Sequence, residues 1–299
     1  MLRREGLSGM ECFYLLSTCL FSAYFIYLAN ADIINANGCG MADYRHNPSA
    51  GQKFQRPLQP WIVYIVTHMD LQDSTKYGTY SCAGSIISPR FVLTSAYCVT
   101  NGICNPTMVK VFYNTTTAER GPYVSASNVF YYPDLKVTSS ANNIAVIMLN
   151  EPLRFDNFVK PVCLPEKSQS LKNKQLGAPN WGKYKDEQGP KTLQYASEKV
   201  LPSSDCTKRW KMPNGTNGTW KKTLLCTQGQ GKNINQGEAG GPLTVVATGK
   251  PAVQVGISSF TFCTKSQRPS AHTRIYSYTP WIKRVLSLCA KWERRRNSH

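Results

Sequence analysis

The chain has 299 residues, of which 41% are hydrophobic, and it carries a formal net charge of +18. This length and apolar content suit one large domain or two small ones with proper cores. Eleven cysteines are too many for a typical cytosolic protein, and the absence of any Cys-x-x-Cys pair or Cys/His cluster argues against a zinc site. The sequence predicts neither a metal nor a cofactor.

The first 31 residues read as a secretory signal peptide. Arg3 and Arg4 supply a positive start, residues 13–28 form a mostly apolar run, and residues 29–31 (Ala-Asn-Ala) match a cleavage site. A retained membrane anchor is the alternative, although serine, tyrosine and cysteine dilute the apolar run. No later stretch could span a bilayer, so we expect a secreted, extracellular protein.

A short polar segment, residues 32–57, follows and contains a single cysteine, Cys39. Short β-branched apolar runs bounded by Gly, Pro and Asn come next. Their length and spacing predict strands of an all-β barrel or sandwich. The runs are 61–67, 85–88, 91–95, 108–113, 144–149, 245–246 and 253–257.

One long helical pattern stands out, at the C-terminal end of the chain. Apolar side chains recur there at helical spacing, with basic residues elsewhere on the helix. We expect this helix to dock on the β domain through one face that carries Trp281, Val285, Leu288, Cys289 and Trp292.

Three N-x-[ST] sequons agree with secretion: Asn114, Asn214 and Asn217. The last two fall in a stretch rich in Gly, Asn and Pro that reads as an exposed loop. We therefore expect a glycoprotein.

Basic residues gather in two places. In a secreted protein such clusters favour anionic glycans, phospholipid surfaces or acidic partners over nucleic acid. The alternative is a solvated basic surface that aids solubility, and the sequence leaves both open. The clusters are Lys208, Arg209, Lys211, Lys221 and Lys222, and residues 294–296.

Three short motifs resemble the signatures of trypsin-like serine proteases. Residues 237–243 (Gly-Glu-Ala-Gly-Gly-Pro-Leu) resemble GDSGGPL, residues 93–98 (Leu-Thr-Ser-Ala-Tyr-Cys) resemble LTAAHC, and residues 142–146 (Asn-Asn-Ile-Ala-Val) resemble NDIAL. Weaker matches at 60–61, 82–85, 160–165, 181–182 and 278–282 extend the resemblance from about residue 59 to residue 282.

The resemblance implies an all-β fold of two six-stranded antiparallel barrels with a C-terminal α-helix, in a domain of residues 58–299. It also implies three disulfides: Cys39–Cys163, which would tether the N-terminal segment, Cys82–Cys98 and Cys206–Cys226.

Three cysteines are left over by this pairing: Cys104, Cys263 and Cys289. The position of the usual partner of Cys263 is occupied by Asn235. Loss of Cys12 and Cys19 with the signal peptide leaves nine of the eleven cysteines, an odd number, so one is either a buried inert thiol or bonds another chain.

All three catalytic positions implied by the resemblance are substituted: Tyr97 stands for the histidine, Asn143 for the aspartate and Ala239 for the serine. Alanine has no hydroxyl, a phenol with a reference pKa near 10 is a poor proton acceptor, and an amide carries no charge. In this family loss of the serine or histidine alone lowers the rate by about 10⁶-fold. The resemblance therefore implies a protein that is not an enzyme.

The surrounding positions depart from the family as well. Gly237 and Ala239 keep the places of the oxyanion-type loop, but Glu238 replaces the aspartate that pairs with the freed amino terminus. The cleavage position near residues 47–51 lacks a preceding Arg or Lys. Zymogen-style activation is therefore predicted to be lost.

The specificity pocket is predicted to be partly filled. Asn233 lies at its base in place of an acidic residue, and Thr261 and Ser270 replace glycines. Ser259 and Phe260 precede Thr261 in the stretch that resembles the pocket wall. Selection for a closed pocket and random drift after loss of function would both produce these substitutions, so the sequence does not distinguish between them.

The resemblance points to a secreted, non-catalytic serine protease homologue of the insect-style kind. Its partners would be extracellular proteases, their substrates or inhibitors, in a proteolytic cascade such as those of immune regulation. One alternative is an active serine-type endopeptidase with a non-standard site, for which His68, His272, Ser258 and Ser259 are candidates, with His46 in the N-terminal segment. Another is a basic protein that binds glycans or lipid surfaces.

Overall fold

A computed structural model of the chain describes residues 34–42, 59–70, 77–100, 105–135, 141–181, 192–209, 222–229, 239–247, 249–260 and 269–296. The predicted signal peptide lies outside the described residues, and so does most of the segment 32–57. Among the helices that are described, none is long and apolar enough to cross a membrane.

The first barrel is built from six antiparallel strands that close in the order β1-β2-β3-β6-β5-β4. Its two shortest strands, β3 and β6, are buried at every residue. The strands are β1 (Ile62–Asp70), β2 (Tyr77–Ser88), β3 (Phe91–Thr94), β4 (Pro106–Tyr113), β5 (Tyr123–Tyr131) and β6 (Ala145–Leu149).

The second barrel closes in the order β10-β11-β12-β9-β8-β7, again with antiparallel neighbours. Its strands are β7 (Gln175–Asn180), β8 (Gln194–Val200), β9 (Leu224–Gly229), β10 (Pro242–Ala247), β11 (Lys250–Phe260) and β12 (Ser270–Arg274). Together the barrels confirm the all-β, two-barrel fold expected from the resemblance.

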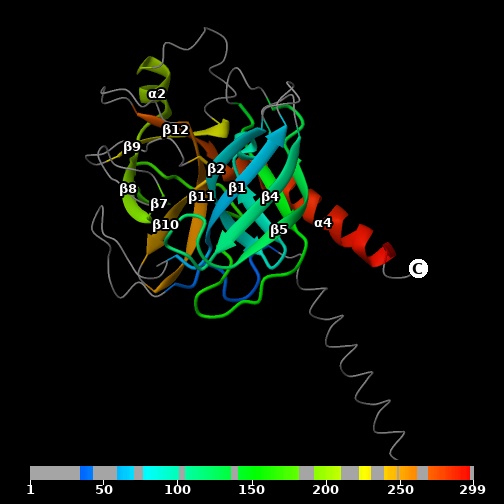
Figure 1. The fold of residues 1–299 in the computed structure, drawn as a ribbon. Coiled ribbons are helices and arrows are strands. Elements are labelled where there is room, and N and C mark those ends of the chain that lie inside the picture. Colours follow the sequence, from blue (N-terminus) through cyan, green and yellow to red (C-terminus); the bar gives the residue numbers. More distant parts are fainter. Residues whose placement is uncertain are drawn as a thin grey trace, which may run out of the picture.

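The helices of the described residues are short except for the last. They are η1 (Ala96–Cys98), α2 (Ser203–Arg209), η2 (Ile275–Tyr278) and α4 (Thr279–Arg296). In Figure 1 the two barrels lie side by side, and α4 leaves the second barrel, passes beside the first and projects beyond it at its C-terminal end.

The helix at the C-terminus is confirmed, but its predicted docking face is partly wrong. Val285 and Cys289 are buried in the core of the first barrel, whereas Leu288 is 56% exposed and Trp292 53% exposed. The contact is instead centred on Ile282 and Leu286, since these residues lie about a quarter turn further round the helix. The apolar residues of this segment cover a wide part of the helix surface. Their spacing predicts a helix, but it does not determine which of them contact the barrel.

The three disulfides implied by the resemblance are confirmed: Cys39–Cys163, Cys82–Cys98 and Cys206–Cys226. The first ties residues 34–42 to the connection between the barrels. Gly40 continues the attachment, since its N–H donates to Pro161 O at 2.8 Å and its carbonyl accepts from Ala252 N at 2.9 Å. Cys289 is buried and belongs to none of the three bonds, while Cys104 and Cys263 lie outside the described residues.

Candidate functional site

Three loops meet where the barrels join, and each carries one of the three substituted positions. Tyr97 lies in η1 just after β3, Asn143 comes two residues before β6, and Ala239 comes three residues before β10. The Tyr97 N–H donates to Asn143 Oδ1 at 3.1 Å, and Ala83 N in the first barrel donates to Ala239 O at 2.9 Å. The structure therefore brings Tyr97 and Asn143 into direct contact, and it places Ala239 beside η1, since Cys98 Sγ lies 3.6 Å from Ala239 O.

Asn143 is fully buried, and both ends of its amide are hydrogen-bonded. Its Oδ1 also accepts from Ser95 Oγ at 2.7 Å, and its Nδ2 donates to Ser259 Oγ at 2.6 Å. Its backbone carbonyl accepts from Thr273 Oγ1 at 2.8 Å. Ser259 and Thr273 belong to the second barrel, so this uncharged side chain is a polar link between the two barrels.

The Ala239 loop is held by the backbone of β11. Gly240 N donates to Ser258 O at 2.7 Å, and Ser258 N donates to Gly241 O at 2.8 Å. Gly240 has φ +86°, and a Cβ there would lie 2.2 Å from both Ala83 O and Thr94 Oγ1. Only glycine fits, because the turn is left-handed and the first barrel presses against it. Gly237, the other residue predicted for the oxyanion-type loop, and Glu238 lie outside the described residues.

Of the predicted pocket positions, Ser259 and Ser270 are described and buried, in β11 and β12. Phe260 ends β11, and nothing is described of its side chain. Asn233 and Thr261 lie outside the described residues. Filling of the pocket therefore stays a prediction.

His272 lies in a buried polar cluster within the second barrel. Its Nε2 is 3.1 Å from Glu198 Oε2 and 2.8 Å from Thr227 Oγ1, and the Thr227 hydroxyl donates to the same Glu198 oxygen. The three side chains come from β12, β8 and β9. Within the part of the chain that is described, Nδ1 of His272 has no hydrogen-bond partner.

The electrostatics of this cluster favour an ionised Glu198. Burial raises the pKa of Glu198, but attraction to His272 and hydrogen bonds from His272 and Thr227 outweigh burial, and they hold the pKa below its ordinary value of 4.5. Sequence reasoning singled out His272 but missed Glu198 and Thr227. No sequence signal joins them, since they come from three separate strands.

Among the candidates for a non-standard active site, Ser258 lies directly opposite His272 in the pairing of β11 with β12. The described contacts of His272 include no serine hydroxyl. His68 lies on β1 and contacts Thr79 Oγ1 at 3.2 Å, and the hydroxyl of Ser259 is bonded to Asn143. His46 lies outside the described residues.

Of the three sequons, Asn114 is exposed directly after β4, and Asn214 and Asn217 lie outside the described residues. Of the first basic cluster, Lys208 and Arg209 end α2, and Lys222 precedes β9; Lys211 and Lys221 are not described. Glycosylation stays a prediction.

Two closed six-stranded barrels that meet at these three loops define the fold of trypsin-like serine proteases. The Trypsin family model matches residues 49–282, and the chain belongs to this family.

Three relatives illustrate the likeness. Tryptase of Mus musculus is 26% identical over 252 residues, which cover 81% of this chain and 90% of the tryptase. The HL collagenase structure superposes with a TM-score of 0.67 at 22% identity, over 79% of this chain and 97% of the collagenase. The scabies mite inactivated protease paralogue S-D1 gives a TM-score of 0.66 at 23% identity, over 80% of this chain and 97% of the paralogue. Because both structures are less than 25% identical to this chain, they show a likeness of fold alone.

Proposed function

We propose that this chain is a secreted, non-catalytic member of the trypsin family that binds proteins of an extracellular proteolytic cascade and regulates them. The observation that carries the proposal is the burial and hydrogen bonding of the neutral Asn143 side chain. At the position that the sequence resemblance assigns to the catalytic aspartate lies a neutral amide that is fully buried and hydrogen-bonded to Ser95, Tyr97 and Ser259.

The two neighbouring positions support the same proposal. The Ala239 side chain is a methyl group and has no hydroxyl to attack a carbonyl. Tyr97 offers a phenol in place of the imidazole that acts as the base in this family. Rate losses in such a site are not additive, so restoring only one of the three groups would recover little.

The scaffold is retained around these substitutions. The disulfides, the closed barrels and the tight Gly240 turn keep the scaffold on which such folds carry their loops, which suits a binding role. The scabies mite neighbour is described as an inactivated protease paralogue, so a two-barrel fold of this shape has a non-catalytic precedent. The disulfides also favour an oxidising, extracellular location.

The test compares the secreted chain with the triple variant Tyr97→His, Asn143→Asp and Ala239→Ser. Both are incubated with a fluorogenic peptide library and with a serine-reactive phosphonate. We expect the natural chain to give neither turnover nor labelling. Turnover or covalent labelling that survives repurification of the natural chain would overturn the non-catalytic assignment.

The binding role is tested separately, by capture from the native extracellular fluid followed by mass spectrometry. Proteases, protease substrates or protease inhibitors should be enriched on the natural chain. A variant with Gly240→Ala, which disturbs the junction between the barrels, serves as the matched control. Absence of all three classes would contradict the regulatory role and leave the non-catalytic assignment standing.

A second candidate function, binding to anionic glycans or lipid surfaces, is favoured by the net charge of +18. It is compatible with the first, because a protein without catalytic activity can bind both a protein partner and a charged surface.

A further inference from the structure

One side of α4 presents a row of basic and apolar side chains to solvent. Successive members are four, three, one and three residues apart, which places them on one face of a helix. All five are exposed, and the two apolar ones are exposed over more than half of their surface. We call this row the α4 stripe: Arg284, Leu288, Lys291, Trp292 and Arg295.

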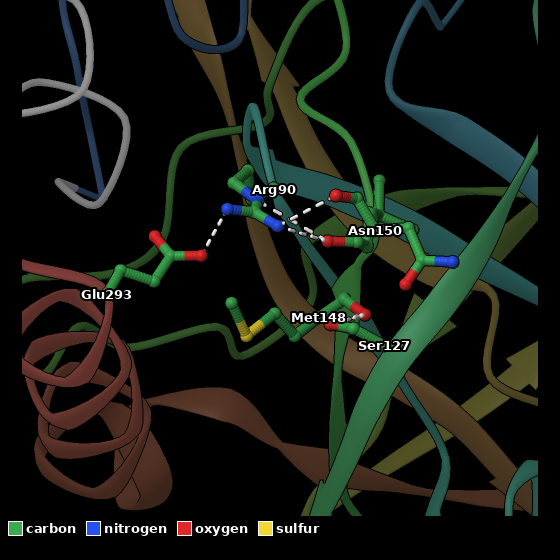
Figure 2. A network of polar contacts seen from close by, with 6 residues as sticks. Arg90, Ser127, Met148, Asn150 and Glu293 are labelled. Atoms are coloured by element: carbon green, nitrogen blue, oxygen red, sulfur yellow. Dashed lines mark hydrogen bonds and ion pairs between the residues drawn. The ribbon is translucent and has the colours of Figure 1, made fainter. Parts of the chain in front are cut away.

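The opposite side of α4 fixes the direction in which the stripe points. Ile282 and Leu286 are buried in the core of the first barrel. Nearer the C-terminal end, Glu293 pairs with Arg90 in the turn between β2 and β3 (Figure 2). Arg90 Nη2 also donates to the carbonyls of Leu149 and Asn150, each at 2.9 Å. The helix is therefore held by its inner side, and its outer side faces away from the barrel.

Nearly all the charged residues of α4 are basic. Glu293 is the only acidic residue in Thr279–Arg296, and its carboxylate is used by Arg90. The stripe itself carries three cations and no anion. Because the whole chain has a net charge of +18, the molecule is drawn towards a negative surface rather than repelled by it.

An apolar hollow lies between the stripe and the barrel. It has a volume of about 370 Å³ and opens beside the two apolar members of the stripe. Its lining residues are Asn128, Phe130, Met148, Leu288, Cys289 and Trp292. A ligand that met the cations could therefore also place an apolar chain against the protein.

We propose that the α4 stripe docks this protein on an anionic phospholipid surface. Leu288 and Trp292 enter the interface between headgroups and acyl chains, where the amphipathic ring of Trp is favoured. Arg284, Lys291 and Arg295 lie along one flank, from which their long side chains reach the lipid phosphates. This role rests on the second candidate function proposed above and names its surface and its residues; it does not depend on whether the site between the barrels is catalytic.

A lipid surface fits these observations better than an acidic polypeptide does. The two apolar side chains are exposed over more than half of their surface, so a flat surface can reach them. The cations lie beside the apolar residues on the same side, as in helices that rest in the membrane interface. A soluble polyanion would use the cations and leave Leu288 and Trp292 without a role.

The experiment measures flotation of the full secreted chain with vesicles at physiological salt. One set of vesicles is phosphatidylcholine alone, and the other contains phosphatidylserine at about a third of the lipid. We expect clear binding to the anionic vesicles and little to the neutral ones. The double variant Leu288→Ser, Trp292→Ser should lose most of the vesicle binding.

A matched pair of charge reversals tests the position of the cations. Arg284→Glu on the stripe and Lys283→Glu on another side of the same helix change the net charge equally, and both residues are exposed. Arg284→Glu should weaken binding by about fivefold or more, since one cation near such a surface contributes about 1 kcal/mol. Lys283→Glu should weaken it much less. Thermal unfolding should be unchanged in the two charge reversals, and it checks that the Leu288→Ser, Trp292→Ser variant remains folded.

Three results would overturn the proposal: no binding to the anionic vesicles, equal loss from the two reversals, or unchanged vesicle binding by the Leu288→Ser, Trp292→Ser variant. Heparin is run in parallel. If heparin retention is strong while vesicles are not bound, the basic surface serves a soluble polyanion instead.

Discussion

Asn143 is held by hydrogen bonds that a carboxylate could also make. Its Oδ1 accepts from Ser95 and Tyr97, and Ser259 Oγ accepts from its Nδ2. In Asn143→Asp the Ser259 hydroxyl can rotate and donate instead, so all three partners stay satisfied. Three donors also offset much of the cost of burying the charge. The substitution should therefore be tolerated.

The contrasting variant, Asn143→Leu, leaves the same partners without hydrogen bonds. Each buried group left unpaired costs about 1–3 kcal/mol, so the loss should reach several kcal/mol. For a protein of this size each kcal/mol lowers Tm by about 2–4 °C. Thermal unfolding followed by circular dichroism measures both variants. If Asn143→Leu were no less stable than Asn143→Asp, the amide would not be the polar link described here.

Gly240 offers a second test at the scale of one residue. Gly240→Ala places a methyl group 2.2 Å from Ala83 O and Thr94 Oγ1, in addition to a strained positive φ. We expect a loss of at least about 2 kcal/mol, because backbone strain alone costs about 1–3 kcal/mol. Gly249→Ala is the matched control, with φ +69° and no atom within 4 Å of the new Cβ. Equal losses in urea denaturation would show that the contact between the barrels adds nothing at Gly240.

Among the elements, the strands with apolar interiors could be predicted from sequence and those with polar interiors could not. β3 and β6 are continuous apolar runs, and both are buried throughout. β12 is as deeply buried, but its sequence is Ser-Ala-His-Thr-Arg. His272 and Thr273 of this strand bond to groups that lie far away in the sequence, and no local pattern reports such contacts. β7, β8 and β9 contain no apolar run longer than three residues and are not predicted for that reason, and β5 is missed because its residues are mostly half-exposed.

In the candidate site, too, the positions of single residues could be predicted from sequence and the contacts between distant residues could not. Motifs located Tyr97, Asn143 and Ala239, because each motif also fixes its strand or turn. The bond between Asn143 and Ser259 was not predicted, since it joins residues of different barrels. α4 was predicted as a helix, but its contact face was not, because eight of its eighteen residues are apolar or aromatic and packing chooses among them.

For the whole molecule, the Glu198 cluster links stability to pH. The pKa of Glu198 lies below its ordinary value of 4.5 in the folded chain. The unfolded chain therefore takes up this proton first as the pH falls. The stabilisation is fully present above about pH 4.5 and is lost as the pH drops towards the lower folded pKa. Chemical denaturation of the natural chain at a series of pH values should show unfolding free energy declining in that window.

Glu198→Gln isolates this contribution. At neutral pH the variant should be less stable by about 1–3 kcal/mol, because the carboxylate oxygen that His272 and Thr227 contact inside the second barrel is lost. The difference from the natural chain should shrink as the pH falls below 4.5, since protonation removes the same charge from the natural protein. Glu151→Gln, at an exposed position, is the control and should change neither quantity. A difference that stays constant across the whole pH series would mean that Glu198 stabilises the barrel through its shape rather than its charge.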